Sequence, residues 1–158
     1  MKILVLGLGN PLVTDDSVGL RVAAELKSRL ADRPEVVVSE DYWGGLRLME
    51  RMAGLDRAID IDAICTGAPP GTIHRLTPGS IPTQRSASTH DVNLATALAL
   101  GRTAGLHLPR DEDILLVGVE AEDILSFGEQ CTPAVAAAIG PAVEEVVRAV
   151  ESLAGTDG

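Results

Sequence analysis

The strongest constraint on the fold is an apolar run at the start of the chain that leads directly into an amphipathic stripe. Residues 2–8 are rich in Leu and Val and are bounded by Gly7 and Gly9, which is typical of a buried strand in a parallel sheet. Aliphatic residues then recur at every fourth position: Val18, Val22, Leu26 and Leu30. Charged residues lie between them, so the stripe predicts a helix that covers one face of the sheet, with capping groups at residues 15–17.

The alternation of strand and helix patterns continues along the chain. Further strands are predicted at residues 35–40, 57–61 and 113–119, and helices at 45–53, from Asp91 or Asn93 to about Ala104, and at 133–153. Residues 71–76 are a further predicted strand, reached by a tight Pro-rich turn that allows an antiparallel neighbour at a sheet edge but no helical crossover. The predicted fold class is α/β: a three-layer sandwich with a mostly parallel twisted sheet of about five strands, one antiparallel edge strand and helices on both faces.

The length of the chain predicts a single domain. Its 158 residues fit one compact unit, residues 1–158, and show no internal repeat, low-complexity tract or linker. Residues 154–158 are expected to be a frayed tail. Gly140-Pro141 lies inside the last predicted helix, and we expect it to kink or split that helix because Pro lacks a backbone donor and clashes with the preceding turn.

Charge and cysteine content exclude several classes of partner. A formal net charge of -10 argues against nucleic acid, which is bound largely through Lys and Arg. No apolar stretch is long enough to span a bilayer, and the N-terminus has the pattern of a first strand rather than of a signal peptide. Cys65 and Cys131 belong to no C-x-x-C pair, so no disulfide framework or structural zinc site is indicated. We therefore expect a cytoplasmic protein, and a monomer, with no membrane partner.

Two acids and one histidine are expected at the carboxyl ends of the predicted strands, where ligands bind in sheets of this kind. Asp16 follows the first strand, Asp62 follows a later one, and His90 lies where a long polar loop, residues 77–89, enters a helix. Asp60 should share a side with Asp62, but farther from the mouth, because side chains alternate along a strand. Taken alone, Asp16 would be explained as a helix cap and His90 as a structural loop residue.

Other candidate motifs have simpler explanations. Residues 7–11, Gly-Leu-Gly-Asn-Pro, first suggest a dinucleotide-binding loop, but Leu12 occupies the sixth position of G-x-G-x-x-G. Glycines that serve a tight turn explain the motif at least as well, and Glu40 would hold a ribose only in the dinucleotide reading. His74 and His107 are expected to be solvated surface residues.

Two carboxylates and one imidazole form the mixed oxygen and nitrogen set that suits a divalent transition metal. A metal held by Asp16, Asp62 and His90 could polarise a peptide carbonyl or lower the pKa of bound water toward ~7. No Ser or Cys lies in a recognisable nucleophile motif, so hydrolysis would depend on metal, water and an acid, with Asp16 as the expected base.

Four stretches resemble the hydrogenase maturation protease family, and together they extend over nearly the whole chain. The most specific is Gly-x-Gly-Asn-x-Leu-x-x-Asp-Asp-x-x-Gly, at residues 7–19. The others are Asp62-Ala63, Ser88-Thr89-His90, and Gly118-Val119-Glu120 followed by Thr132-Pro133. They are informative only in combination.

This resemblance implies an endopeptidase, a hydrolase of the aspartyl protease type, that acts in hydrogenase maturation. It would remove a C-terminal extension from the large-subunit precursor of a nickel-iron hydrogenase after nickel insertion. Asp16, Asp62 and His90 carry over as catalytic and metal-binding residues that recognise nickel held by the precursor, and the isolated protein would bind a divalent surrogate ion. Ser17 and the loop at residues 41–45 depart from the family pattern and leave the hydrogenase subtype open.

Two other functions fit part of the sequence. A peptidyl-tRNA hydrolase also opens with Gly-Leu-Gly-Asn-Pro, but its turn continues with Gly, Tyr and a histidine-bearing stretch, where this chain has Leu12, Val13 and Asp15-Asp16. A non-catalytic maturation chaperone that senses metal on its client would use the same three ligands without hydrolysis.

Overall fold

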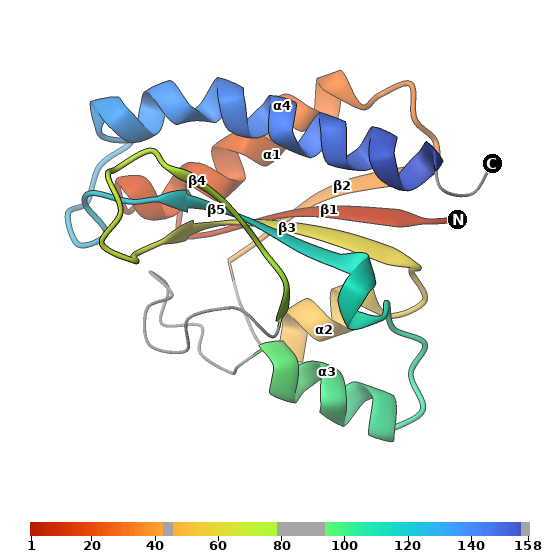
Figure 1. The fold of residues 1–158 in the computed structure, drawn as a ribbon. Helices are drawn as coiled ribbons and strands as arrows, with labels where there is room; N and C mark the ends of the chain where they lie inside the picture. Colours follow the sequence, from red (N-terminus) through yellow and green to blue (C-terminus); the bar gives the residue numbers. More distant parts are fainter. Residues whose placement is uncertain (43–45, 79–93, 156–158) are drawn as a thin grey trace.

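The computed structural model describes residues 1–42, 46–78 and 94–155, and Figure 1 shows its fold. The elements, in chain order, are β1 (Ile3–Leu8), the 3-10 turn η1 (Asp15–Ser17), α1 (Val18–Arg29), β2 (Val36–Asp41), α2 (Leu46–Met52), β3 (Arg57–Ile64), β4 (Ile73–Leu76), α3 (Leu94–Thr103), the 3-10 turn η3 (Asp111–Asp113), β5 (Ile114–Glu120) and α4 (Pro133–Gly155). Each predicted strand and helix is present, with bounds that differ by a few residues.

The strands form one sheet in the order β2-β1-β3-β5-β4. β1, β2, β3 and β5 run parallel, and β4 lies at the edge, antiparallel to β5. In Figure 1, α1 and α4 cover one face of the sheet and α2 and α3 cover the other. The predicted α/β class, with its antiparallel edge strand and two helical layers, is confirmed.

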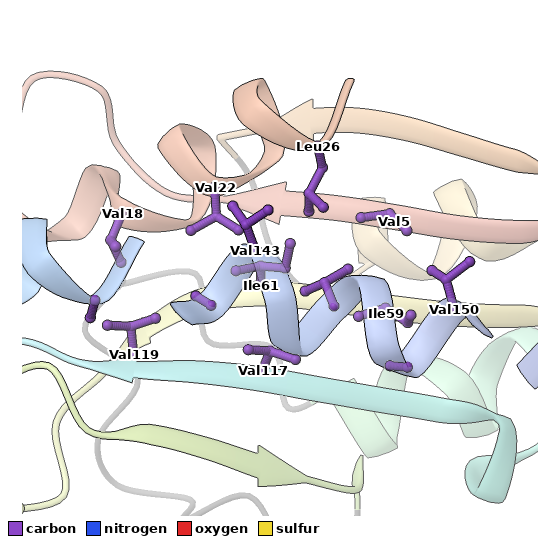
Figure 2. Close-up of a cluster of buried hydrophobic side chains, with 14 of the residues drawn as sticks. Val5, Val18, Val22, Leu26, Ile59, Ile61, Val117, Val119, Val143 and Val150 are labelled. Carbon is purple, nitrogen blue, oxygen red and sulfur yellow. The ribbon is translucent and has the colours of Figure 1, made fainter. Parts of the chain in front are cut away.

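Each face of the sheet has its own aliphatic core. The core against α1 and α4 contains only Val, Ile, Leu and Ala among its fully buried members, including Val22, Leu26 and Ile59 (Figure 2). The opposite core joins alternate residues of β1, such as Leu4 and Leu6, to α2 and α3. Burial of each such side chain stabilises the fold by about 1.5–3 kcal/mol, so the cores fix the sheet on which any site must be built.

The last helix corrects one half of the prediction that Gly140-Pro141 would kink or split it. α4 is not split at Gly140-Pro141 but runs without interruption from Pro133 to Gly155. Both residues are exposed, and the buried stripe of α4 continues on either side of them. Packing against the sheet and α1 therefore outweighs the backbone hydrogen bond that Pro141 cannot make. The helix also includes Ala154 and Gly155, which were expected in the tail.

Two further features bear on the expected character of the chain. Cys65 and Cys131 are both free cysteines of intermediate exposure. Among the helices in the described parts of the chain, none has both the length and the apolar character that crossing a membrane requires.

Candidate functional site

Glycines bring the turn after β1 into close contact with the end of β3. A Cβ atom on Gly19, in the first turn of α1, would lie 2.3 Å from the carbonyl oxygen of Ile61 and 2.4 Å from that of Leu8. Gly9 has a φ of +150°, and a Cβ there would lie 2.0 Å from the carbonyl oxygen of Asp16. The glycines of the opening motif therefore allow a tight, closely packed turn between strand and helix. This is the explanation that the sequence analysis set against a dinucleotide-binding loop. The glycines place Asp16 beside the β3 residues that precede Asp62.

Asp16 and Asp62 form a pair of neighbouring carboxylates. Asp16 is 5% exposed, and its Oδ2 accepts a hydrogen bond from the backbone N–H of Asn10 at 3.1 Å. Asp62 lies within β3 rather than beyond its end, and its Oδ1 accepts from the backbone N–H of Ala63 at 2.8 Å. Burial, and next the charge of Asp16, raise the pKa of Asp62 well above its ordinary value. The structure thus brings together two of the three predicted site residues.

Asp60 lies on the same side of β3 as Asp62 and deeper in the sheet, as predicted. It is fully buried, and within the described residues neither of its carboxylate oxygens has a hydrogen-bond partner. Its strand neighbours in the sheet are Leu6 and Leu116. Burial raises the pKa of Asp60 to about 8, so this carboxyl is mostly protonated at neutral pH.

Asp15, the neighbour of Asp16, has a different environment and is not a helix cap. Its Oδ2 accepts from the backbone N–H groups of Glu122 and Asp123 at 2.9 and 2.8 Å, and its Oδ1 accepts from that of Thr132 at 2.8 Å. The Thr132 hydroxyl donates to it as well. Asp15 therefore fastens the loop between β5 and α4 to the turn that carries Asp16. The capping prediction for residues 15–17 is wrong, since no side chain there caps α1.

His74 corrects the prediction of a solvated surface histidine. Its side chain is 22% exposed, and its Nε2 lies 3.1 Å from Oε1 of Glu120, a carboxylate that is 3% exposed. Glu120 also accepts from the backbone N–H and the hydroxyl of Thr66. Burial acts to raise the pKa of Glu120, but the hydrogen bonds from Thr66 and His74 prevail and lower it.

The sheet register places this polar pair near the acids of β3. Gly118 of β5 lies opposite Asp62 on one side and His74 on the other, so the three residues form one row across the sheet. Their side chains share a face because residues in register do so. The antiparallel pairing of β4 with β5 creates this row, and a sequence pattern alone does not show which residues it aligns. The Gly-Val-Glu motif was the available signal.

The remaining site prediction falls on residues that the structure does not describe. His90 lies in the segment 79–93, outside the described residues, as does most of the polar loop at residues 77–89. Within the described residues no group of three or more His, Cys, Asp or Glu side chains could hold a metal ion. His107 is 68% exposed and lies 3.4 Å from Asp56 at the far end of the sheet, which agrees with the prediction of a surface residue.

The acid pair is chemically suited to a cation. Asp16 is buried and Asp62 is half-buried, so their charges repel each other and are partly desolvated, and a proton or a metal ion between them lowers the energy. Two carboxylate ligands, one from η1 and one from β3, also leave room for further ligands from a substrate. The two carboxylates therefore suit a divalent cation that a substrate already coordinates better than a cation that this protein alone would coordinate.

Fold and site together define an open α/β protein with an acidic site at the carboxyl ends of parallel strands. The model of the family described as hydrogenase maturation protease matches residues 20–149. The chain is 35% identical over 153 residues to the hydrogenase 2 maturation protease of Escherichia coli (strain K12), which covers 95% of this chain and 91% of that protein. It is 30% identical to the hydrogenase expression/formation protein HupD of Thiocapsa roseopersicina, over 90% of this chain and 65% of that protein.

A solved structure agrees with these relatives. The hydrogenase-maturating endopeptidase HybD from E. coli superposes with a TM-score of 0.78 at 33% identity, over 96% of this chain and 93% of that one. The chain therefore belongs to the hydrogenase maturation protease family, a family of hydrolases that cleave peptide bonds. Membership in this family favours the maturation protease over the peptidyl-tRNA hydrolase alternative.

Proposed function

We propose that this protein is the endopeptidase that removes the C-terminal extension of a nickel-iron hydrogenase large-subunit precursor once nickel has been inserted. Asp16 and Asp62 bind the nickel that the precursor carries, and His90 supplies a nitrogen ligand. The metal belongs to the substrate, so the enzyme tests for its presence and positions the scissile bond in the same act.

The observation that carries this proposal is the pair of neighbouring carboxylates at the carboxyl edge of the sheet, of which Asp16 is buried and Asp62 is half-buried. Family membership supplies the class of reaction, and the pair supplies a reason for dependence on metal. Because the pKa of Asp62 is raised by burial and by Asp16, the pair without a metal ion tends to keep a proton. A precursor that lacks nickel offers nothing to displace that proton, whereas nickel would displace it and draw both carboxylates into contact.

The described residues have separate tasks in this scheme. Asn10 holds Asp16 in place through its backbone N–H, and Ala63 does the same for Asp62. In this scheme Asp16 is the group that accepts a proton from an attacking water molecule. Asp15 keeps the turn fixed without contacting the substrate, since its oxygens are occupied by the loop between β5 and α4.

The test compares nickel-loaded and nickel-free precursor. The purified full chain is added to each form, and the mass of the large subunit is followed by mass spectrometry. We expect loss of the C-terminal extension only from the nickel-loaded form. Equal cleavage of both forms would refute nickel recognition, and no mass loss from either would refute the proteolytic function.

The same experiment separates the metal-sensing chaperone. A chaperone would bind the nickel-loaded precursor through the same residues and leave its mass unchanged. Membership in a family of peptide-bond hydrolases favours cleavage.

A further inference from the structure

Three large apolar side chains are exposed at the edge of the sheet that carries the acid pair. Leu12 is 64% exposed, Leu125 86% and Phe127 85%, and we call these three residues the rim patch. They lie on two segments that meet in an antiparallel bridge between Val13 and Phe127. Burial of large apolar side chains is favourable, and folding leaves these three in contact with water. Phe127 is the single Phe of the chain.

The backbone that presents the rim patch is held firmly. Asp123 accepts hydrogen bonds from the backbone N–H groups of Leu125 and Ser126 at 3.0 and 2.9 Å. Thr14 donates to the carbonyl of Ser126 through both its N–H and its hydroxyl, and Gly128 donates to the carbonyl of Leu12 at 3.0 Å. The apolar side chains are therefore displayed on a prepared backbone, which lowers the entropy cost of binding a partner.

The rim patch is continuous with the proposed active site. Leu12 and Asp16 lie on the same turn, four positions apart, so the backbone between them spans at most about 14 Å. Asp15 ties this turn to the start of the segment that carries Leu125 and Phe127. A peptide whose scissile bond lies at the acid pair would reach the rim patch within about four residues in an extended conformation.

The charges around the rim patch specify the rest of the partner. Glu122 and Glu129 are exposed on either side of Leu125 and Phe127, in a chain with a net charge of -10. We propose that the rim patch binds an apolar stretch of the large-subunit precursor, flanked by Lys or Arg and within about four residues of the scissile bond. This inference rests on the proposed function and identifies the surface that selects the client.

The same charges disfavour two other occupants. A second copy of this chain would bring Glu122 and Glu129 against their own copies, and two chains of the same high negative charge repel each other. An anionic membrane surface would meet the same repulsion. A basic and apolar peptide is the occupant that both the exposed side chains and their surroundings favour.

The test replaces the apolar side chains and leaves the site intact. The double variant Leu125→Ser/Phe127→Ser of the full chain is compared with the wild type in cleavage of the nickel-loaded precursor. We expect KM to rise about tenfold or more, as expected for loss of two buried apolar contacts, with kcat changed less than about twofold. The control is Leu100→Ser, which removes a side chain that is 55% exposed on α3. It should leave both constants unchanged.

Direct binding separates failure of this proposal from failure of the proposed function. The dissociation constant of the full chain for the nickel-loaded precursor is measured by calorimetry for each variant. If the wild type cleaves and the double variant keeps its KM, the rim patch is not a client surface although the proteolytic function stands. If the wild type binds without cleaving and the double variant binds about tenfold more weakly, the client surface stands and the proteolytic function falls. If the wild type does neither, both fall.

Two further measurements test the identity of the occupant. Glu122→Gln/Glu129→Gln should weaken binding and reduce its dependence on salt, because both acids attract the basic residues of the client. An unchanged salt dependence would refute that part of the proposal. Sedimentation of the wild type should give a monomer. A dimer that the Leu125→Ser/Phe127→Ser variant dissociates would show that the rim patch binds a second copy, and would overturn the proposal.

Discussion

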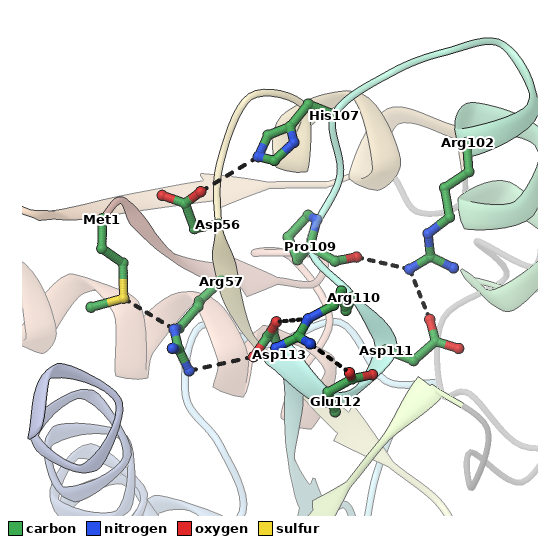
Figure 3. Close-up of polar contacts among 10 residues, drawn as sticks. All are labelled: Met1, Asp56, Arg57, Arg102, His107, Pro109, Arg110, Asp111, Glu112 and Asp113. Carbon is green, nitrogen blue, oxygen red and sulfur yellow. Dashed lines mark hydrogen bonds and ion pairs between the residues drawn. The ribbon is translucent and has the colours of Figure 1, made fainter. Parts of the chain in front are cut away.

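The two ends of the sheet both carry acids but treat them in opposite ways. At the amino end, shown in Figure 3, charged side chains pair with each other at the surface: Asp56 with His107, Asp111 with Arg102, and Glu112 and Asp113 with Arg110. At the carboxyl end, Asp15, Asp16, Asp41 and Glu120 are each no more than 5% exposed. Exposed pairs contribute little to stability and their loss is tolerated, whereas a buried carboxylate must be compensated.

This contrast between the two ends indicates where a reactive site can form. The depression of about 470 Å³ at the amino end is lined by Arg57, Arg110 and Asp113 among others, and these side chains already satisfy one another. At the carboxyl end, Asp15 and Glu120 are compensated by hydrogen bonds, but Asp60 and Asp62 have raised pKa values. Among the described residues of the two ends, it is the acids at the carboxyl end whose charge a bound cation or proton would stabilise.

The largest effect is expected from the acid pair. Asp16→Asn and Asp62→Asn should each reduce cleavage of the nickel-loaded precursor by at least ~100-fold, because each removes a proposed ligand of the nickel. Circular dichroism should show an unchanged fold. Asp56→Asn, at the exposed amino end, is the control and should cleave at the wild-type rate. Normal processing by either site variant would show that the acid pair is not the metal site.

The next prediction compares the effect of adding a methyl group at two helix glycines, Gly19 in α1 and Gly140 in α4. Gly19→Ala should lower the free energy of unfolding by about 3 kcal/mol and abolish cleavage, because the new methyl group would collide with the Ile61 and Leu8 carbonyls. Gly140→Ala has nothing within 4 Å of the new atom. Its gain in helix propensity is offset by the restriction before Pro141, so stability should change by less than about 0.5 kcal/mol. Urea denaturation measures both, and equal effects would refute the packing role of Gly19.

The pH dependence of stability tests the buried end directly. The pKa of Asp60 is about 8 in the folded protein against 3.8 ordinarily, so the folded state binds this proton more tightly than the unfolded chain. The free energy of unfolding should therefore fall as pH rises from about 4 to about 8, on the order of a few kcal/mol. Asp60→Asn should flatten that decline, with a residual slope of the same sign from Asp62. Urea titrations at pH 5 and pH 8 measure it, and an unchanged slope would exclude Asp60 as the source.

The smallest contrast compares two histidine–carboxylate pairs. His74→Ala should lower the free energy of unfolding by about 1–2 kcal/mol, because it removes a hydrogen bond to the buried carboxylate of Glu120. His107→Ala removes a partner of the exposed Asp56 and should leave the denaturation midpoint unchanged. Similar midpoints for the two variants would mean that burial of Glu120 does not matter.

The sequence predicted the layers of the fold and part of the site because both follow from periodicity. Alternation along β3 put Asp60 and Asp62 on one side, and the position of Asp16 after β1 put it at the neighbouring strand end. The partners of Asp15 and His74 could not be predicted, since they come from residues 46 to 117 positions away. Likewise, only tertiary packing explains why α4 continues through Pro141. The role of His90 stays a prediction.

The all-aliphatic core beneath α1 and α4 has a practical consequence. Its hydrophobic members come from α1, α4 and one face of the sheet, while the acids of β3 project from the opposite face. Substitutions such as Val to Ile in that layer could raise the melting temperature without altering the electric field at the acid pair. A heat-tolerant variant for industrial hydrogenase assembly would therefore be sought on that side of the molecule first.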